Sequence, residues 1–235
     1  MTEFARPGVA LVIPVLNEGE AIVDVVRAVP GDIVDEVIVV DGGSRDDTVA
    51  QARQAGARVL IEARSGYGAA CLAGTRGATP ACQVIAFMDG DGSDDPADLK
   101  AIVAPILSGG HDFVIGSRVR GTREDGSLGM HQVVAGHVVG VAIRLLYGVQ
   151  YTDMGPLRAI RRDALKALGM REKTYGWNLE MQMRAARAGL RILEVPVHHR
   201  RRAGGASKVA GSLAGSVKAS YQIVAALARV ALDPR

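Results

Sequence analysis

Short apolar runs alternate with amphipathic segments through the first half of the chain. The apolar runs are rich in β-branched residues, which is typical of strands that are buried on both faces of a parallel sheet. This alternation predicts an α/β fold with a Rossmann-like, mostly parallel sheet flanked by helices. Strands are predicted over residues 9–15, 36–40, 58–61, 84–88 and 113–116, and helices over residues 17–28, 47–55, 65–78 and 96–107.

The simple alternation stops after Arg118. Residues 119–128 are polar and contain glycine, so we expect a mobile lid there. Residues 130–147 are apolar on most sides and predict a helix, for which burial in the domain is favoured over a position on a membrane surface. An irregular stretch is expected over residues 152–160, then a helix over residues 176–188 and a strand over residues 191–197.

The 235 residues suit one substantial domain with a smaller extension. We place the domain at residues 1–211 and an amphipathic C-terminal helix at residues 212–235. This helix could pack on the domain, pair with another subunit or lie on a membrane. The oligomeric state stays open.

The stretch VIAFMDGDGSDDP, residues 84–96, carries four aspartates directly after a predicted strand. Asp89 and Asp91 leave the strand together, and two adjacent carboxylates repel each other unless a cation lies between them. Such oxygen ligands suit Mg²⁺ or Mn²⁺ shared with the phosphates of a substrate. The alternative is a solvated turn in which Ser93 or Asp94 caps the next helix, and we assign Asp94 and Asp95 mainly to that structural role.

Composition and charge narrow the classes of partner. Hydrophobic residues make up 48% and charged residues 23% of the chain, as in an ordinary globular protein. Aromatic residues are only 4%, which argues against a base-stacking surface for nucleic acid despite a pI near 9.0. The basic run HHRRR at residues 198–202 predicts anionic partners near the C-terminal third.

Cysteine usage and hydropathy indicate a cytoplasmic protein. Cys71 and Cys82 lie in apolar surroundings without the spacing of metal ligands, so we expect reduced core thiols. The first seven residues show no signal peptide, and no run of about 20 apolar residues would cross a bilayer. A peripheral position on the cytoplasmic face of the membrane is the alternative.

Polar residues end several predicted strands at what should be one edge of the sheet. They are Asn17, Glu18, Asp41, Asp89, Asp91 and Arg118. A dinucleotide enzyme would carry G-x-G-x-x-G after the first strand, where this chain has PVLNEGE, and the Walker lysine motif is absent as well. Carboxylates, one cation and scattered basic residues fit a nucleotide diphosphate that binds with its metal.

The ordered set PVLNE, VDGGSRDDT, MDGDGSDDP and GSR resembles family 2 glycosyltransferases of the GT-A fold. The likeness is greatest to the dolichyl- or polyprenyl-phosphate mannosyl- and glucosyltransferases, because EVPV is followed by Arg202, Ser207 and Lys208. The family pattern SGF or SGFR is here GPLR, the Q-x-x-R-W motif of processive synthases is missing, and so are the C-terminal membrane segments of some relatives.

The resemblance implies a role for each matching residue. Pro14, Asn17 and Glu18 would line the nucleotide pocket, and Asp41 would approach the base and ribose. Asp89 would hold the sugar nucleotide. Asp91 would bind the metal, and Asp89 would also contribute to the metal site. Arg118 would contact the sugar or its phosphate. Arg202 and Lys208, with Ser207, would hold the diphosphate of the donor or the phosphate of the acceptor.

The expected activity is inverting, metal-dependent transfer of a hexose from a UDP- or GDP-sugar to polyprenyl phosphate or a similar phosphate or hydroxyl acceptor. A hydroxyl acceptor needs a base, for which Asp153 and Glu180 are the candidates. Each has a structural alternative, since Asp153 could stabilise a turn and Glu180 could pair with Arg184 one helical turn later. The rival functions are a non-catalytic sugar-nucleotide or lipid-phosphate binding module, a nucleotidyltransferase, and a transferase that acts on a small soluble acceptor.

Overall fold

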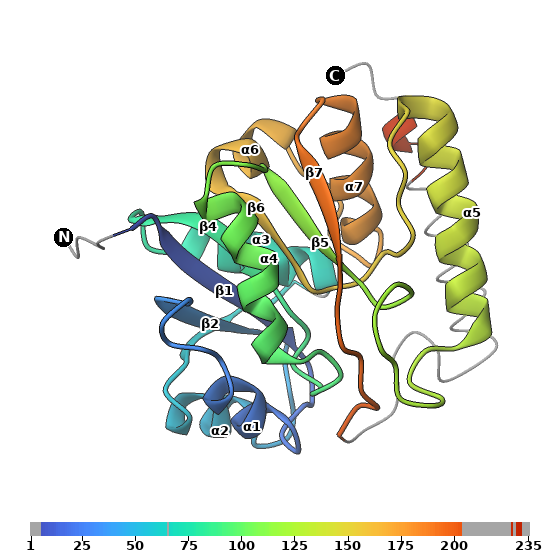
Figure 1. Ribbon diagram of the computed structural model, residues 1–235. Helices are drawn as coiled ribbons and strands as arrows, with labels where there is room; N and C mark the ends of the chain where they lie inside the picture. Colours follow the sequence, from blue (N-terminus) through green and yellow to red (C-terminus); the bar gives the residue numbers. More distant parts are fainter. Residues whose placement is uncertain (1–5, 65, 204–226, 228, 232–235) are drawn as a thin grey trace.

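A seven-stranded sheet forms the centre of the computed structural model, which describes residues 6–64, 66–203, 227 and 229–231 (Figure 1). The strand order is β3-β2-β1-β4-β6-β5-β7. The strands are β1 (Gly8–Val15), β2 (Glu36–Asp41), β3 (Arg58–Ile61), β4 (Cys82–Phe87), β5 (Phe113–Ser117), β6 (Arg158–Arg161) and β7 (Ile192–Pro196). The expected α/β class is confirmed, with every strand predicted over residues 9–116 present within two residues of its expected bounds.

The sheet is parallel except at β6, which runs antiparallel to both β4 and β5. The sequence analysis placed an irregular stretch over residues 152–160 and therefore missed this strand. Its sequence is RAIR, and Arg158 is fully buried, so the strand lacks the continuous apolar run that marks the parallel strands. The guanidinium of Arg158 donates to the backbone oxygens of Gly155 and Asn178, which satisfies its polar atoms inside the domain.

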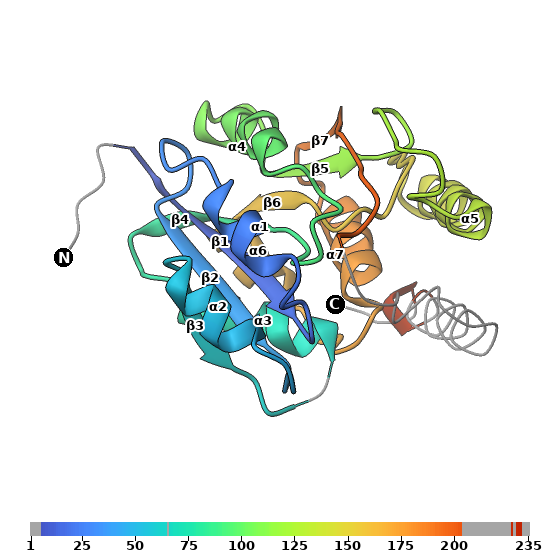
Figure 2. The same cartoon turned by 90° about the horizontal axis from the view of Figure 1, so that it is seen from below.

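Helices cover both faces of the sheet (Figure 2). The helices are α1 (Ile22–Arg27), α2 (Thr48–Gln54), α3 (Tyr67–Gly77), the 3₁₀ turn η1 (Pro96–Asp98), α4 (Leu99–Leu107), α5 (Met130–Tyr147), α6 (Arg162–Leu168) and α7 (Trp177–Arg187). Alternate residues of β1 point to opposite cores: Ala10 and Val12 pack with α3, α6 and α7, while Leu11 and Ile13 pack with α1, α2 and α4. Helix α1 begins five residues later than expected, because Asn17 has a left-handed backbone (φ 54°) that cannot start a helix.

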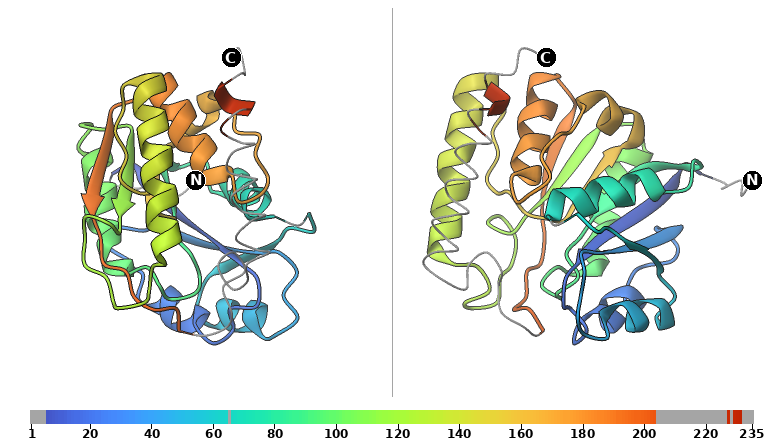
Figure 3. Two further views of the ribbon diagram at one scale, coloured as in Figure 1. Left: turned by 90° about the vertical axis from the view of Figure 1, so that its right-hand side faces the viewer. Right: turned by 180° about the vertical axis from the view of Figure 1, so that it is seen from behind.

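Helix α5 has the predicted bounds, but the expectation that it is buried is wrong for one of its faces. Its inner face contacts α7 and the chain near Tyr151, where Gly140 permits close approach: a Cβ at this position would lie 2.2 Å from the backbone oxygen of Tyr151. Its outer face carries large apolar side chains in solvent. Figure 3 shows α5 standing along one side of the molecule. Among the helices that the structure describes, none is both long and apolar enough to cross a bilayer.

The division into a domain and a C-terminal helix stays a prediction, since residues 204–226 lie outside the described part of the chain. Residues 227 and 229–231 are helical, and Val230 is buried against the domain. Its backbone oxygen accepts a hydrogen bond from Nη1 of Arg187 at 3.1 Å.

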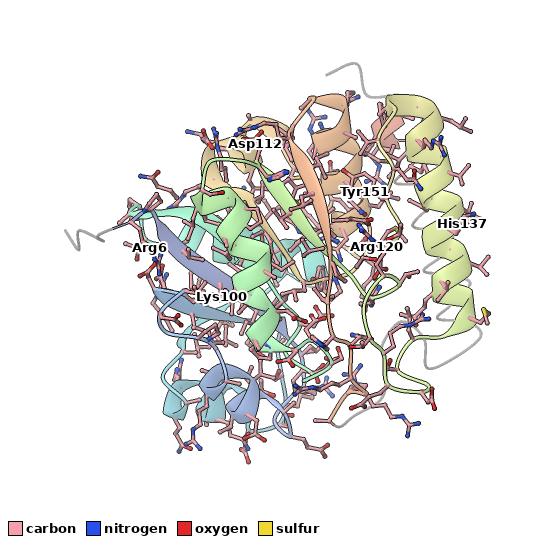
Figure 4. The ribbon with its side chains drawn as sticks, viewed as in Figure 1. Arg6, Lys100, Asp112, Arg120, His137 and Tyr151 are labelled. Atoms are coloured by element: carbon pink, nitrogen blue, oxygen red, sulfur yellow. The ribbon has the colours of Figure 1, made fainter. Side chains whose placement is uncertain are left out.

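Asp112 ties three strands together at the edge opposite the polar strand ends (Figure 4). Its Oδ2 accepts from the backbone nitrogen and Nε of Arg191, both at 3.0 Å, and its Oδ1 accepts from Nη2 of Arg191 and Nη1 of Arg161. These bonds join the starts of β5 and β7 to the end of β6. The hydrogen bonds from Arg191 lower the pKa of Asp112 from 3.8 to about 2.

We expect Asp112→Asn to lower the free energy of unfolding by about 1–2 kcal/mol, since both arginines are half exposed and lose only part of their pairing energy. Because the pKa of the folded state is the lower one, the wild-type advantage should be complete above about pH 5 and disappear as the pH falls towards 2. Urea unfolding at several pH values measures this. A stability difference that persists unchanged at pH 2 would contradict it.

Candidate active site

The turns that follow β1 and β2 are locked to each other at the carboxyl edge of the sheet. The side chain of Asn17 accepts a hydrogen bond from the backbone nitrogen of Arg45, and its own backbone nitrogen donates to Oγ of Ser44, both at 2.8 Å. One turn further, the backbone nitrogen of Glu18 donates to Oγ1 of Thr48 at 2.9 Å. Asparagine tolerates the left-handed conformation that this arrangement requires. The sequence motifs PVLNE and VDGGSRDDT therefore form one structural unit.

Asp41 holds the second of these turns. Its side chain is 3% exposed, and its carboxylate accepts from the backbone nitrogens of Gly43 and Ser44. Pro14 is partly exposed and lies opposite Val40 in the β1–β2 register. The structure thus places Pro14, Asn17, Glu18 and Asp41 on two adjoining strand ends, while their contacts with a nucleotide stay a prediction.

Asp89 and Asp91 follow β4 at the same edge. Oδ1 of Asp91 accepts from the backbone nitrogen of Ser93 at 2.9 Å, which fixes the loop. Oδ1 of Asp89 is buried and has no hydrogen-bond partner among the described residues. Burial raises the pKa of Asp89 well above its ordinary value, and the negative charges of Asp94 and Asp91 raise it further. Asp94 does not cap the next helix: its Oδ2 accepts from the backbone nitrogen of Asp89 at 3.3 Å, while Asp95 caps η1 by accepting from the backbone nitrogen of Ala97.

Arg202 joins the loop after β4 to the turn after β1. Its Nη2 lies 3.0 Å from Oε1 of Glu18, and its Nη1 lies 3.4 Å from Oδ2 of Asp91. The segment after β7 that carries it is held by backbone hydrogen bonds, from the nitrogen of Ala203 to the oxygen of Asp91 and from the nitrogen of Arg200 to the oxygen of Ser93. The structure therefore places Arg202 beside Glu18 and Asp91, while its contact with a phosphate stays a prediction. Ser207 and Lys208 lie outside the described residues.

Arg118 and Asp153 form a two-pronged ion pair beside this loop. Nε and Nη2 of Arg118 each lie 2.8 Å from a different carboxylate oxygen of Asp153, and the backbone nitrogen of Arg118 also donates to it. Burial alone would raise the pKa of Asp153, but the hydrogen bonds and charge of Arg118 outweigh it and lower the pKa below its ordinary value. Asp153 therefore positions Arg118, a structural role that differs from the turn stabilisation expected from the sequence.

Glu194 supports this pair and was not singled out from the sequence. Its Oε1 accepts from the backbone nitrogen of Thr152 at 2.8 Å, and its Oε2 accepts from Oγ1 of Thr152 at 3.0 Å. Thr152 in turn bonds to Ser117, the residue before Arg118. The sequence signal was the first residue of EVPV, whose polar side chain in a strand needs a partner.

Glu180 is enclosed within the helical layer. It is 3% exposed, and its carboxylate accepts from Nε of Arg184 at 2.8 Å and from the backbone nitrogens of Arg171 and Glu172. Each oxygen thus has a donor from the protein. The geometry supports the pairing with Arg184 and argues against Glu180 as a base.

Comparison with known proteins is consistent with this arrangement. Residues 10–169 match the family model described as glycosyl transferase family 2. An uncharacterized glycosyltransferase of Mycobacterium tuberculosis (strain ATCC 25618 / H37Rv) is 39% identical over 218 residues, which cover 91% of this chain and 95% of that protein. The chain belongs to glycosyl transferase family 2.

Two further relatives of this family 2 enzyme have named activities. The undecaprenyl-phosphate mannosyltransferase of Micrococcus luteus is 32% identical over 195 residues, which cover 77% of this chain and 78% of that protein. The crystal structure of glucosyl-3-phosphoglycerate synthase from M. tuberculosis with Mn²⁺, UDP-glucose and phosphoglyceric acid has a TM-score of 0.78 and 25% identity, and the match covers 98% of this chain and 81–82% of the compared chains. The GT-A fold is confirmed.

The carboxylates after β4 of the glycosyltransferase suit the binding of a divalent cation. A buried carboxylate oxygen at Asp89 without a hydrogen-bond partner in the described structure, close to the charges of Asp91 and Asp94, is an environment that a cation would stabilise. The described residues contain no group of three or more His, Cys, Asp or Glu side chains arranged around one metal position. The protein would thus supply only part of the coordination shell, as expected for a metal shared with phosphates.

We expect Glu180→Gln to destabilise the enzyme without removing its chemistry. Breaking this buried pair should lower the free energy of unfolding by about 2–4 kcal/mol and the melting temperature by about 5–12 °C. Turnover per folded molecule should stay within about threefold of wild type, because no step needs this carboxylate.

Arg184→Gln breaks the same pair from its other side and should behave alike. Thermal unfolding measures the loss of stability, and initial rates taken well below the transition measure turnover. A variant with unchanged melting temperature but turnover reduced about 100-fold would restore Glu180 as a base.

Proposed function

We propose that the enzyme transfers one hexose from a UDP- or GDP-sugar to the phosphate group of a polyprenyl phosphate, with inversion at the anomeric carbon and with Mg²⁺ or Mn²⁺. The observation that carries the proposal is that hydrogen bonds from the protein already occupy both oxygens of each candidate base. Asp153 is bound at both oxygens by Arg118, and Glu180 by Arg184 and two backbone nitrogens. A hydroxyl acceptor would need one of them, whereas a phosphate acceptor is already an anion and needs no base.

In the reaction, an oxygen of the acceptor phosphate forms a bond to the anomeric carbon of the sugar. The bond between that carbon and the donor diphosphate breaks, and its electron pair leaves with the nucleoside diphosphate. No proton moves in this step. Attack from the side opposite the leaving group inverts the anomeric configuration, so the product's configuration is a direct readout.

Two arginines would stabilise the negative charge that develops on the leaving diphosphate. Arg118 is held rigid by Asp153, so its orientation needs no rearrangement during the reaction. Arg202 lies between Glu18 and Asp91 and can bring a guanidinium to a phosphate at the same edge. Asp89 and Asp91 would hold the divalent cation, which when bound neutralises phosphate charge and so improves the leaving group.

The relatives support different parts of the proposal. The solved synthase binds Mn²⁺ together with UDP-glucose, which favours a metal and a uridine donor here. The mannosyltransferase of M. luteus is named for undecaprenyl phosphate, which favours a lipid phosphate as acceptor. A small soluble phosphate compound is the second candidate, because the solved synthase is in complex with phosphoglyceric acid.

Transfer assays separate the two acceptors. Purified enzyme with Mn²⁺ and radiolabelled UDP-glucose, UDP-N-acetylglucosamine or GDP-mannose is offered either undecaprenyl phosphate in detergent or 3-phosphoglycerate. The proposal is supported if label moves only into the lipid fraction and the anomeric proton of the product shows, by NMR, the configuration opposite to that of the donor. Transfer only to phosphoglycerate would replace it with the second candidate.

Nucleotide binding should depend on the cation and on Asp91. A nucleotide at about 100 times its dissociation constant adds about 2.7 kcal/mol, which raises the melting temperature by roughly 5–10 °C. We expect this rise with either UDP or GDP in the presence of Mn²⁺, and its loss in Asp91→Asn, which keeps the oxygen that accepts from Ser93. Differential scanning fluorimetry with and without Mn²⁺ measures it. If neither nucleotide raises the wild-type melting temperature, the donor site is wrongly assigned.

Arg202→Ala should raise the KM for the donor or the acceptor about 10- to 100-fold, since one charge-assisted contact to phosphate is lost. Arg200→Ala is the matched control, because Arg200 is half exposed and pairs with Asp95 in place of the site carboxylates. Its KM values should stay within about twofold of wild type. Steady-state kinetics in both substrates measures the difference, and equal effects of the two variants would remove Arg202 from the site.

A further inference from the structure

The outer face of α5 carries a continuous row of exposed apolar side chains. We call Met130, Val134, Val138, Val141 and Leu145 the α5 stripe. Their side chains are 77%, 54%, 61%, 45% and 82% exposed, respectively. Their spacing of four, four, three and four residues places them on one face of a helix.

The helix cannot turn this face inward. On the opposite side Val139 and Ile143 are buried in the core, and Gly140 packs directly against the backbone of Tyr151. Tyr151, which is labelled in Figure 4, in turn donates through its hydroxyl to the backbone oxygen of Gln182 in α7. Rotating α5 would remove these contacts and force a larger residue against Tyr151. The α5 stripe is therefore committed to the outside of the domain.

The stripe is also large for a surface feature. From Met130 to Leu145 it runs about 22 Å along the helix. Single exposed apolar residues are common on soluble proteins, but a contiguous row of this length marks a contact surface.

Charge decides which partner fits. Helix α5 contains no aspartate or glutamate. Its exposed His137 and Arg144 lie along one border of the stripe. The loop before the helix carries the exposed Arg123 beside the exposed Glu124 and Asp125, and Glu124 accepts a hydrogen bond from the backbone nitrogen of Arg201. A second copy docked stripe to stripe would offer His137 and Arg144 no acidic partner from α5. A membrane surface with anionic headgroups offers both an apolar layer for the stripe and negative charge for its border.

The position of α5 relates this surface to the site. The loop of residues 119–129 leaves β5 at Arg118 and leads directly into Met130, so the first turn of α5 lies at the end of the loop that starts in the site (Figure 1). A lipid that carries the acceptor phosphate has its headgroup at the membrane surface. A helix lying on that surface would bring this edge of the domain to the headgroups.

We propose that the α5 stripe lies on the surface of a membrane that contains anionic lipids and so presents the active site to a membrane-embedded acceptor. The second half of this statement rests on the proposed function. The first half rests on the stripe alone.

Vesicle sedimentation tests the membrane contact. The full chain is mixed with vesicles of phosphatidylcholine alone or with phosphatidylglycerol added, and the bound fraction is measured. We expect binding that strengthens with phosphatidylglycerol and falls about tenfold or more in the double variant Val134→Asp/Val138→Asp. Ile61→Asp is the matched control, because Ile61 is 59% exposed on the edge strand at the far end of the sheet. It should bind like wild type.

Two outcomes overturn the inference: wild-type protein that does not bind either vesicle, or a double variant that binds as wild type does. Loss of binding counts only if the variant keeps its circular dichroism spectrum and melting temperature; if it does not, Val134→Ser/Val138→Ser replaces it. Size-exclusion chromatography adds a third outcome. A wild-type dimer that the double variant turns into a monomer, without vesicle binding, would assign the stripe to a second copy.

A pair of acceptors separates this inference from the proposed function. The double variant should transfer sugar to a water-soluble short-chain prenyl phosphate within about twofold of wild type but lose about tenfold with undecaprenyl phosphate in vesicles. Vesicle binding without transfer to either lipid would leave the membrane contact standing and remove the lipid acceptor. Equal loss with both acceptors would show that the variant damages the site, and so would contradict a role confined to membrane contact.

Discussion

Repulsion among carboxylates is the constraint that shapes the functional edge of this protein. Glu18, Asp89, Asp91 and Asp94 gather at the ends of β1 and β4, and the pKa of Asp89 is raised by burial and by two of these neighbours. Arg202 offsets part of this charge by lying between Glu18 and Asp91. The negative charge that Arg202 does not offset favours the binding of a cation near Asp89. A site of this kind holds a negatively charged diphosphate only when positive charge accompanies it.

Beside these carboxylates lies a second charged group, the ion pair of Arg118 and Asp153, in which the two charges neutralise each other. Arg118 and Asp153 satisfy each other, and Glu194 anchors the backbone that carries Asp153. Two neighbouring acidic groups therefore have different consequences for chemistry: Asp89 keeps an oxygen unpaired within the described structure, while Asp153 has none to offer. This division is the basis for the proposal that the acceptor arrives as an anion and need not lose a proton.

The sequence predicted the elements whose patterns depend on local rules. The parallel strands showed as apolar runs, and the motifs that end them lie at one edge because parallel strands share a direction. The sequence failed where long-range contacts override local patterns. β6 is polar in composition and is a strand because its neighbours pair with it, and α1 starts late because Asn17 bonds to a turn 28 residues away. No local pattern shows that Arg202 contacts Glu18 across 184 residues; only the resemblance to a family pointed to it.

Gly140 sets how far the outer helix stands from the rest of the domain. The missing side chain lets α5 rest on the backbone at Tyr151, so the thickness of this side of the molecule is fixed by one contact between a helix and an extended segment. Two residues beyond that contact comes Asp153, the partner of Arg118. The same short segment thus sets both the spacing of the outer surface and the orientation of a basic side chain in the site. Displacement at one end would reach the other through only two peptide units.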